Sequence, residues 1–391
     1  MLTTLAVENY RSLRDLVLPL SGLTLVTGPN GSGKSSLYRA LRLLADASRN
    51  GAVAALAREG GLQSTLWAGP ETHGRAVREG HAPVQGTVRT KRVALRLGFT
   101  GDEFGYALDL GLPNIAPTPP SPFVLDPEIK RECVWRGATL RKSALLADRG
   151  GSAVWTRRAD GSWREDPDRI RLTDSMLSEF ADPRACPELL VLRERIRSWR
   201  FYDQFRTDAG APARQARIGT RTPVLGHDGG DLAAALETIN ESGDAGALAT
   251  AVDNAFPGSR LLVKNSDGRF ELCLRQQGLL RPLGVAEMSD GTLRYLLLVA
   301  ALCTPSPPEL LVLNEPETSL HPDLLPALAA LIANAAKRTQ LVVVSHARPL
   351  IRALEQVSEH ATTLELEKEL GQTVLSGQGR LDRPGWHWPK R

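Results

Sequence analysis

Hydrophobic residues follow helical and strand-like periods in different parts of this chain of 391 residues. Residues 1–45 predict a strand, a turn, a second strand at Leu23–Val26, a glycine-rich loop and a helix. In the helix, Leu37, Leu41 and Leu44 fall on one face, which is typical of an amphipathic helix that packs against a core. This order indicates the start of an α/β domain.

Alternation of apolar and polar residues dominates from about residue 84 to residue 160. The segments Val93–Phe99 and Gly105–Leu110 follow this period of two, which predicts strands. A proline-rich loop at Pro113–Pro122 interrupts them. We therefore expect an antiparallel sheet in this part of the chain.

Residues 165–260 predict mainly helices. We expect Asp231 to cap a helix at Leu232–Ile239, and apolar residues from Leu248 to Phe256 recur at helical spacing. The segment has no sustained heptads, which argues against a long coiled coil.

The last third of the chain returns to mixed structure. Asn265–Gly268 predicts a hairpin turn, and the segment from Pro349 onward predicts one helix and a short hairpin. That segment is too short for an appended nuclease domain, and no internal repeat is visible.

Composition describes an ordinary globular protein, with 42% hydrophobic and 24% charged residues, long enough for two or three domains. No run of about 18 apolar residues and no signal-peptide core occurs, so we expect a cytoplasmic protein without a membrane partner. The four cysteines are too far apart for a zinc or disulfide framework, and we expect them to be core thiols. They are Cys133, Cys186, Cys273 and Cys303.

The charge gives only a weak indication of the partner. A net charge of +4 and a pI near 9.0 permit nucleic-acid binding without demonstrating it. Arginine outnumbers lysine 40 to 8, which fits either phosphate recognition or a GC-rich genome, and we favour the genomic interpretation.

Gly28–Ser35 fits the pattern G-x-x-x-x-G-K-[ST] directly after the apolar run at Leu23–Val26. In such a loop the backbone N–H groups surround a polyphosphate, and the helix that follows adds its positive end. Lys34 would reach the β/γ oxygens, and the Ser35 hydroxyl would bind Mg²⁺. The sequence thus predicts a phosphate-binding loop.

A second group of motifs begins about 250 residues later. These are Met288–Thr292 at the start of an apolar helix, Leu310–Glu317 at the end of a buried strand, Thr318–Pro322, and a strand Leu341–Val344 that runs into Ser345 and His346. In this order they resemble the signature motif, Walker B strand with catalytic glutamate, D-loop and switch histidine of ATP-binding-cassette (ABC) ATPases.

Two stretches narrow the resemblance. Leu5–Leu13 and the sequence Glu-Pro-Glu-Thr-Ser-Leu-His-Pro at 315–322 resemble the RecF/SMC-like ATPases. That class includes the ATPase part of OLD-type nucleases and many stand-alone proteins of bacterial anti-phage systems. The resemblance covers roughly residues 1–66 and 284–350.

The resemblance implies an α/β fold: an ABC-type P-loop ATPase head with an antiparallel β subdomain and a mainly helical insertion. The expected domains are 1–160, the N-terminal part of the head with the β subdomain; 161–260, the helical insertion, a lid or arm; and 261–391, the C-terminal part of the head.

The resemblance also implies ATP and Mg²⁺ as cofactors and a homodimer that sandwiches ATP between the loop of one protomer and the signature motif of the other. Glu315 and His346 would be catalytic. The implied nucleotide-binding residues are Asn30, Gly31, Ser32, Gly33, Lys34, Ser35, Ser36, Ser289, Gly291 and Arg11. The implied metal-binding residues are Ser35, Gln63 and Asn314.

Asn314 departs from the family pattern, which has aspartate there to hold the Mg²⁺ shell. A neutral amide offers an oxygen without charge, so weaker metal binding is expected, and the rate of hydrolysis is left open. Glu317 either supplies the missing charge or is a solvated helix-entry residue.

Four other residues also allow structural interpretations. Gln63 is either a Q-loop glutamine or a polar turn residue, and Arg11 either reaches the nucleotide or is a surface arginine. Ser289 would also serve as a plain helix cap. We take His321 as a helix-entry residue rather than a ligand.

The stretch 193–206 interleaves arginines with aromatic residues. Such a pattern is able to hold phosphates and stack bases, although an amphipathic element with a solvated face is the commoner explanation. DNA is thus a candidate partner.

Together these features predict an ATPase that closes two heads on ATP and reopens them on hydrolysis, in DNA maintenance or anti-phage defence, with a separately encoded effector. The alternative is the nucleotide-binding subunit of an ABC transporter. The long gap between Lys34 and Ser289 and the sequence at 315–322 argue against it.

Overall fold

The computed structural model describes residues 1–49, 51–72, 77, 81, 90, 92–113, 122–158, 160–180, 182–379 and 381–391. These residues form two compact units. Unit 1 comprises residues 1–21, 27–198 and 364–391, and unit 2 comprises residues 22–26 and 199–363. These units are defined by how the residues pack. The domain boundaries expected after residues 160 and 260 were defined by sequence motifs, and they stay a prediction.

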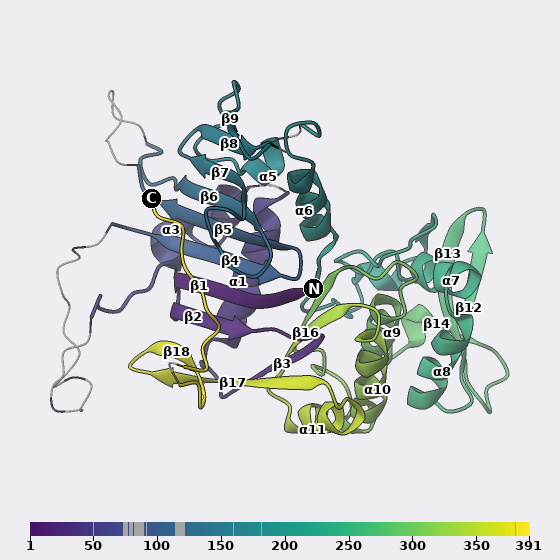
Figure 1. The fold of residues 1–391 in the computed structure, drawn as a ribbon. Coiled ribbons are helices and arrows are strands. Elements are labelled where there is room, and N and C mark those ends of the chain that lie inside the picture. Colours follow the sequence, from purple (N-terminus) through teal and green to yellow (C-terminus); the bar gives the residue numbers. More distant parts are fainter. Residues whose placement is uncertain are drawn as a thin grey trace. The chain divides into compact units, whose positions relative to one another are not determined.

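An eight-stranded antiparallel sheet is the centre of unit 1 (Figure 1). Its order is β2 (Leu13–Pro19), β1 (Leu2–Tyr10), β4 (Leu95–Gly101), β5 (Phe104–Gly111), β6 (Glu128–Arg136), β7 (Leu145–Gly150), β8 (Ala153–Arg157) and β9 (Trp163–Glu165). The expected antiparallel sheet is confirmed. The N-terminal prediction was wrong in one respect: it omitted β2, whose buried Leu16–Leu18 pair with β1. Most of the predicted loop 113–122 lies outside the described residues.

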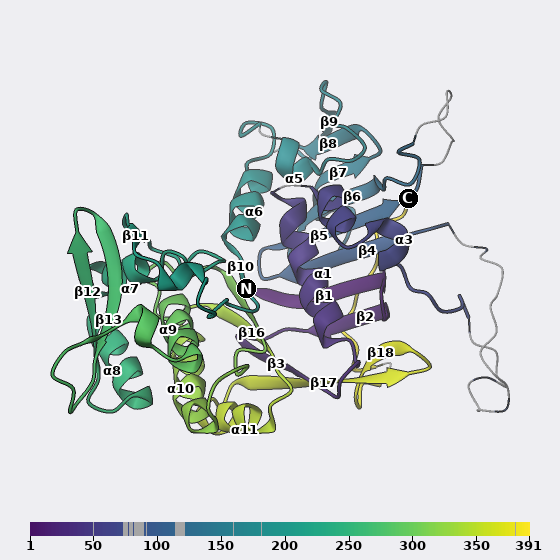
Figure 2. The same cartoon turned by 180° about the vertical axis from the view of Figure 1, so that it is seen from behind.

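Both faces of this sheet are covered. The helix α1 (Lys34–Ala47) lies on one face (Figure 2), and its Leu37, Leu41 and Leu44 are buried as predicted. The C-terminal segment crosses the other face, where Trp386 packs against Trp135. The described part of this unit also contains the helices α2 (Ala52–Arg58), α3 (Gly61–Thr65), α5 (Met176–Glu179) and α6 (Pro187–Ser198).

A fully buried ion pair lies within unit 1. Arg149 on β7 and Glu132 on β6 have no exposed side-chain surface, and their N and O atoms are 3.2 Å apart. Tyr106 and the backbone N–H of Met176 also donate to the Glu132 carboxylate. Burial next to this carboxylate raises the pKa of Tyr106 well above its usual value.

Parallel strands form the centre of unit 2. Their order is β10 (Arg200–Tyr202), β15 (Leu310–Asn314), β16 (Gln340–Val344) and β3 (Leu23–Thr27). The last three are apolar along nearly their whole length, as expected for strands buried on both faces. The helices α9 (Asp290–Leu302), α10 (Leu325–Ala335) and α11 (Arg348–Val357) contribute buried side chains to the same core.

The rest of unit 2 combines two helices with a small sheet. The helices are α7 (Leu232–Ser242) and α8 (Ala245–Ala255), and the strands are β11 (Arg217–Ile218), β12 (Arg260–Ser266), β13 (Arg269–Arg275) and β14 (Leu283–Gly284). Asp267 and Gly268 form the β12–β13 turn with positive φ, which confirms the predicted hairpin. The predicted cap at Asp231 was wrong in detail, because its carboxylate accepts from the N–H of Gly226 and makes no cap to α7.

The predicted C-terminal helix and hairpin are present as α11 and the pair β17 (Ala361–Glu369) and β18 (Gln372–Leu375). All four cysteines are buried, as expected of core thiols. In the described ranges, no helix is long and apolar enough to cross a membrane. The mixed α/β class expected from the sequence is confirmed.

Candidate functional site

The predicted phosphate-binding residues form one loop and the first turn of α1: Asn30, Gly31, Ser32, Gly33, Lys34, Ser35 and Ser36. The Lys34 ammonium donates to the carbonyls of Gly28 and Pro29 at 2.8 and 3.0 Å, so it lies over the centre of the loop. The first turn of α1 has no acidic residue, and its N-terminal N–H groups favour an anion. The loop therefore has the chemistry of a phosphate cradle.

Two positions of the loop require glycine, because another segment of the chain lies too close to leave room for a Cβ atom. Gly28 and Gly33 have φ of 137° and 111°, in the region that L side chains rarely adopt. A Cβ at Gly33 would lie 2.1 Å from the hydroxyl oxygen of Thr373, and one at Gly28 would lie 2.2 Å from the carbonyl oxygen of Leu366. The β17–β18 hairpin thus packs directly on the loop.

Thr373 is a site residue that the motifs did not indicate. Its buried hydroxyl donates to the carbonyl of Ser32 at 2.7 Å and lies 2.9 Å from the hydroxyl of Ser12. The contact holds the middle of the loop to the C-terminal hairpin. Nothing in the local sequence around Thr373 signals this, since it depends on the hairpin folding back over the loop.

A second group of polar residues lies at the carboxyl ends of the parallel strands of unit 2. Asp203 follows β10, Asn314 ends β15 and Glu315 follows it, and His346 follows β16 after one residue. Parallel pairing sets Tyr202 opposite Leu313 and Asn314 opposite Val344. All these side chains consequently meet at one edge of the sheet, the usual position of ligand sites in parallel α/β sheets.

The two residues expected to be catalytic are in contact there. The Glu315 carboxylate oxygen lies 3.2 Å from His346 Nδ1. Glu315 has a φ of 48°, a left-handed conformation that costs a non-glycine residue of order 1–3 kcal/mol. Its N–H donates to the carbonyl of Val344 at 2.8 Å, which holds the turn in place. The carboxylate is 40% exposed, so water has access to it.

Glu317 is buried, which argues against the interpretation of a solvated helix-entry residue. One carboxylate oxygen accepts from the Ser345 hydroxyl at 2.6 Å and from the N–H groups of His346 and Ala347 at 3.3 Å. The other oxygen, Oε2, is buried and has no hydrogen-bond partner. An anionic oxygen in this position is costly unless a cation or a donor approaches it.

Asn314 is oriented by a residue that sequence analysis missed. Its amide nitrogen donates to the Asp203 carboxylate at 2.7 Å, while its amide oxygen is buried without a partner. The signal that would have revealed Asp203 is its position one residue beyond a strand that pairs with the Walker B strand. That pairing is not readable from the sequence alone.

These oxygens suit Mg²⁺. The amide oxygen of Asn314 and Oε2 of Glu317 are unpaired, and hard oxygen donors are the ligands Mg²⁺ prefers. Over the residues with described positions, no cluster of three or more His, Cys, Asp or Glu side chains could hold a metal by itself. A Mg²⁺ ion here would take its remaining ligands from phosphate and water, as it commonly does.

A buried arginine balances part of this charge. Arg294 on α9 is 3% exposed and donates weakly to the carbonyls of Phe205 and Glu315. Burial lowers the pKa of its guanidinium, and the carboxylates of Asp203, Glu317 and Glu315 act in the opposite sense. Among the described residues, none of the three forms an ion pair with it.

The signature residues line an open concavity in unit 2. Ser289 and Gly291 lie beside Ser319 and His321 in a pocket of about 640 Å³. Ser289 caps α9 by accepting from the N–H of Thr292 at 3.1 Å, so its cap role is observed. The exposed Ser289 and the N-terminus of α9 nevertheless face an accessible space. His321 caps the short 3₁₀ helix η3 (Pro322–Leu324), in line with the helix-entry interpretation.

The remaining two expected ligands lie in unit 1. Gln63 is exposed on α3, and its role in metal binding stays a prediction. The guanidinium of Arg11 pairs with Glu59 at 2.7 Å, and Tyr10 donates to the same carboxylate at 2.6 Å. Arg11 is thus engaged in a structural contact here, and its approach to a nucleotide stays a prediction.

In the stretch 193–206 the structure favours the commoner explanation, an amphipathic element, over base stacking. The aromatic residues of this stretch are buried in the core, so they do not stack bases. They are Trp199, Phe201, Tyr202 and Phe205.

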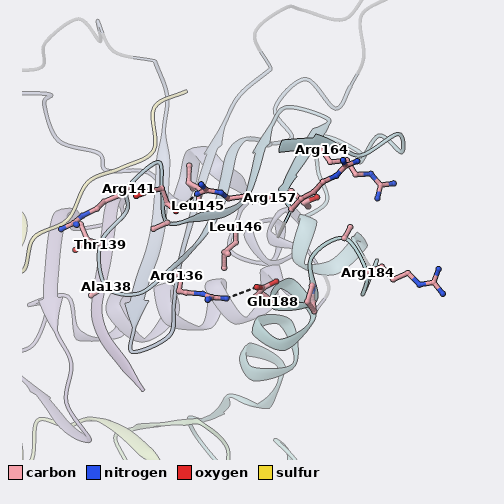
Figure 3. Close-up of a pocket in the computed structure, with 16 residues that line it drawn as sticks. Arg136, Ala138, Thr139, Arg141, Leu145, Leu146, Arg157, Arg164, Arg184 and Glu188 are labelled. Atoms are coloured by element: carbon pink, nitrogen blue, oxygen red, sulfur yellow. Dashed lines mark hydrogen bonds and ion pairs between the residues drawn. The ribbon is translucent and has the colours of Figure 1, made fainter. Parts of the chain in front are cut away.

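A different basic surface occurs in unit 1, a pocket of about 980 Å³ that we call the arginine pocket (Figure 3). Six arginines and one carboxylate, Glu188, line it. The arginines are Arg136, Arg141, Arg157, Arg158, Arg164 and Arg184. Only Arg136 forms an ion pair in the described structure, with Glu188 at 3.1 Å.

The chain is similar to several known proteins. A family model described as "AAA domain, putative AbiEii toxin, Type IV TA system" matches residues 23–353. A 44-residue segment is 50% identical to an OLD nuclease from Thermus scotoductus (strain ATCC 700910 / SA-01). That segment is 11% of this chain and spans 8% of the relative's length.

Solved structures of SMC head domains are similar over 96% of this chain. The head domain from Thermotoga maritima has a TM-score of 0.46 at 14% identity, and 97% of that chain is covered. A head domain with an extended coiled coil bound to the C-terminal domain of ScpA, from Pyrococcus furiosus, has a TM-score of 0.48 at 12% identity, with 95% covered.

Proposed function

The chain belongs to the AAA-domain family whose model it matches, an ABC-type ATPase family of the RecF/SMC-like class related to OLD nucleases, and on this premise we propose that it binds and hydrolyses ATP. The observation that carries the proposal is the contact between Glu315 and His346 at the carboxyl edge of the parallel sheet. An exposed carboxylate that a histidine orients is suited to accept a proton from attacking water.

The other residues would position the phosphates. The loop N–H groups and the Lys34 ammonium neutralise the β- and γ-phosphate oxygens. Mg²⁺ would supply charge neutralisation on the phosphates. Its candidate ligand in unit 1 is the Ser35 hydroxyl, and its candidate ligands in unit 2 are the amide oxygen of Asn314 and Oε2 of Glu317. Glu315 takes a proton from the attacking water. The Nδ1 atom of His346 contacts the carboxylate and keeps it oriented toward that water.

We further propose that two copies dimerise around ATP. The concavity at Ser289 and Gly291 supports this, because an exposed helix N-terminus beside an open space suits the γ-phosphate of a nucleotide on a second copy.

Nucleic acid is the proposed partner in DNA maintenance or anti-phage defence, together with a separately encoded effector. The arginine pocket supports it, because several of its arginines form no ion pair among the described residues, and such a surface suits a phosphate backbone. The transporter alternative gains no support from the family match.

The test is phosphate release and light scattering of the purified protein with Mg²⁺ and ATP. We expect ATP-dependent phosphate release and a shift from monomer to dimer on adding ATP. Absence of ATP binding by calorimetry would overturn the proposed activity, and a monomer at saturating ATP would overturn the dimer alone.

A further inference from the structure

Asp203 and Asn314 are set side by side by strand register. Tyr202 and Leu313 are partners in the parallel pair β10–β15, so the residues that follow them emerge together at the same edge. The distance from the Asn314 amide nitrogen to the Asp203 carboxylate oxygen is 2.7 Å. This contact joins two segments that are 111 residues apart.

The contact determines which atom of the Asn314 amide remains available to bind a ligand. A carboxylate accepts hydrogen bonds only, so the NH₂ group must face Asp203 and the amide oxygen must point elsewhere. That oxygen is buried and has no partner. Asn314 therefore presents a neutral oxygen ligand, while a formal negative charge lies next to it on the neighbouring strand.

The charge balance of the edge depends on Asp203. Three carboxylates act on the buried guanidinium of Arg294: those of Asp203, Glu315 and Glu317. Counted over these four side chains, the formal charge is −2, and Asp203 contributes one of the three negative charges. Without Asp203 the edge would keep only one net negative charge.

We propose that Asp203 supplies the metal-site charge that asparagine at position 314 does not carry, so that the pair Asp203–Asn314 does the work of a single Walker B aspartate. Asn314 gives the oxygen ligand, and Asp203 both orients the amide and provides the charge. The inference rests on the proposed function, since the metal enters with the nucleotide.

The test uses the full-length protein and Mn²⁺ as the metal probe. Free Mn²⁺ is measured by electron paramagnetic resonance at a saturating concentration of a non-hydrolysable ATP analogue. Asp203→Asn keeps an acceptor for the Asn314 amide but removes the charge, and we expect Mn²⁺ to bind about three- to tenfold more weakly. The matched control is Asp208→Asn, an exposed aspartate on the same segment whose described ion pair is with Arg206.

Moving the charge back separates electrostatics from structure. Asn314→Asp alone sets two carboxylates at hydrogen-bond distance, so it loses the contact and adds repulsion. The double variant Asp203→Asn with Asn314→Asp exchanges the two groups, which restores both the hydrogen bond between the two positions and the single negative charge. We expect its Mn²⁺ affinity to be within about twofold of that of the wild type. Thermal melts of each variant report folding separately from metal binding.

The outcomes are distinguishable. If the wild type binds no nucleotide, the proposed function fails. If it binds nucleotide and Asp203→Asn leaves Mn²⁺ affinity unchanged, only the role of Asp203 fails. Nucleotide affinity of Asp203→Asn is also compared with that of the wild type in EDTA and in the presence of metal. If the variant loses the same affinity under both conditions, Asp203 is merely structural, which would likewise overturn the inference.

Discussion

The hydroxyl of Thr373 donates a hydrogen bond to the carbonyl of Ser32 across 341 residues of sequence, at a distance of 2.7 Å. The bond ties the phosphate loop to a hairpin near the C-terminus. The backbone of the loop must point its N–H groups inward to hold phosphate. A carbonyl that is fixed on the outer side restricts the other conformations that the loop backbone could adopt.

We expect Thr373→Val to weaken ATP binding about three- to tenfold, because the isosteric side chain leaves a buried carbonyl without its donor at a cost of about 1 kcal/mol. Calorimetric titration with ATP measures the effect. Thr363→Val is the control, since its hydroxyl donates to the exposed Glu355. Unchanged affinity in Thr373→Val would show that the hairpin does not organise the loop.

Lys34→Ala should lower ATP affinity about 10- to 100-fold, because charge-assisted hydrogen bonds contribute about 1.5–3 kcal/mol. The control is Lys337→Ala, an exposed lysine of unit 2. Equal ATP affinity in the wild type and in Lys34→Ala would show that Gly28–Ser35 is not the nucleotide site.

Glu315→Gln should bind ATP as the wild type does but slow phosphate release at least about 100-fold, since the carboxylate acts in the chemical step. An ATP-bound dimer should accumulate and be seen by light scattering. Glu241→Gln, at an exposed position on α7, is the control. Wild-type turnover in Glu315→Gln would remove this carboxylate from the mechanism.

The arginine pocket predicts a salt-dependent effect on nucleic-acid binding. Arg164→Ala with Arg184→Ala should weaken binding to duplex DNA and reduce the slope of log affinity against log salt by about 1–2. Fluorescence polarisation over a series of salt concentrations measures it. The control pair Arg221→Ala and Arg269→Ala removes two exposed charges from unit 2. Equal losses in both pairs would indicate a general charge effect rather than a site.

The buried pair of unit 1 gives a prediction about stability. Arg149→Met leaves the Glu132 carboxylate uncompensated and should reduce the free energy of unfolding by about 3–5 kcal/mol. Arg169→Met breaks an exposed pair with Glu165 and should cost less than about 1 kcal/mol. Urea titrations followed by circular dichroism compare the two. Similar midpoints would mean that the Glu132–Arg149 pair does not support the fold.

Sequence reasoning succeeded where the signal is local. The loop at Gly28–Ser35, the amphipathic face of α1 and the hairpin at Asp267 and Gly268 depend on neighbouring residues, and the structure has each element where it was expected. The alternation at 93–110 likewise predicted paired strands.

What the sequence could not show depends on distant pairing. Asp203 becomes part of the site only through the register of β10 on β15, and Thr373 only through the fold of a hairpin over the loop. For the interleaved aromatics at 199–205, the sequence pattern left base stacking open as the less common explanation. Only their burial in the core, which depends on tertiary packing, decides against it.

The path of β3 has a consequence for biogenesis. Leu23 pairs with Leu341, while the residues that follow Val26 belong to the other unit. During translation, this apolar strand leaves the ribosome long before β16 exists to receive it. The nascent chain must therefore keep a hydrophobic strand from pairing elsewhere. So high a contact order makes the closing of unit 2 a late event that waits for the synthesis of β16.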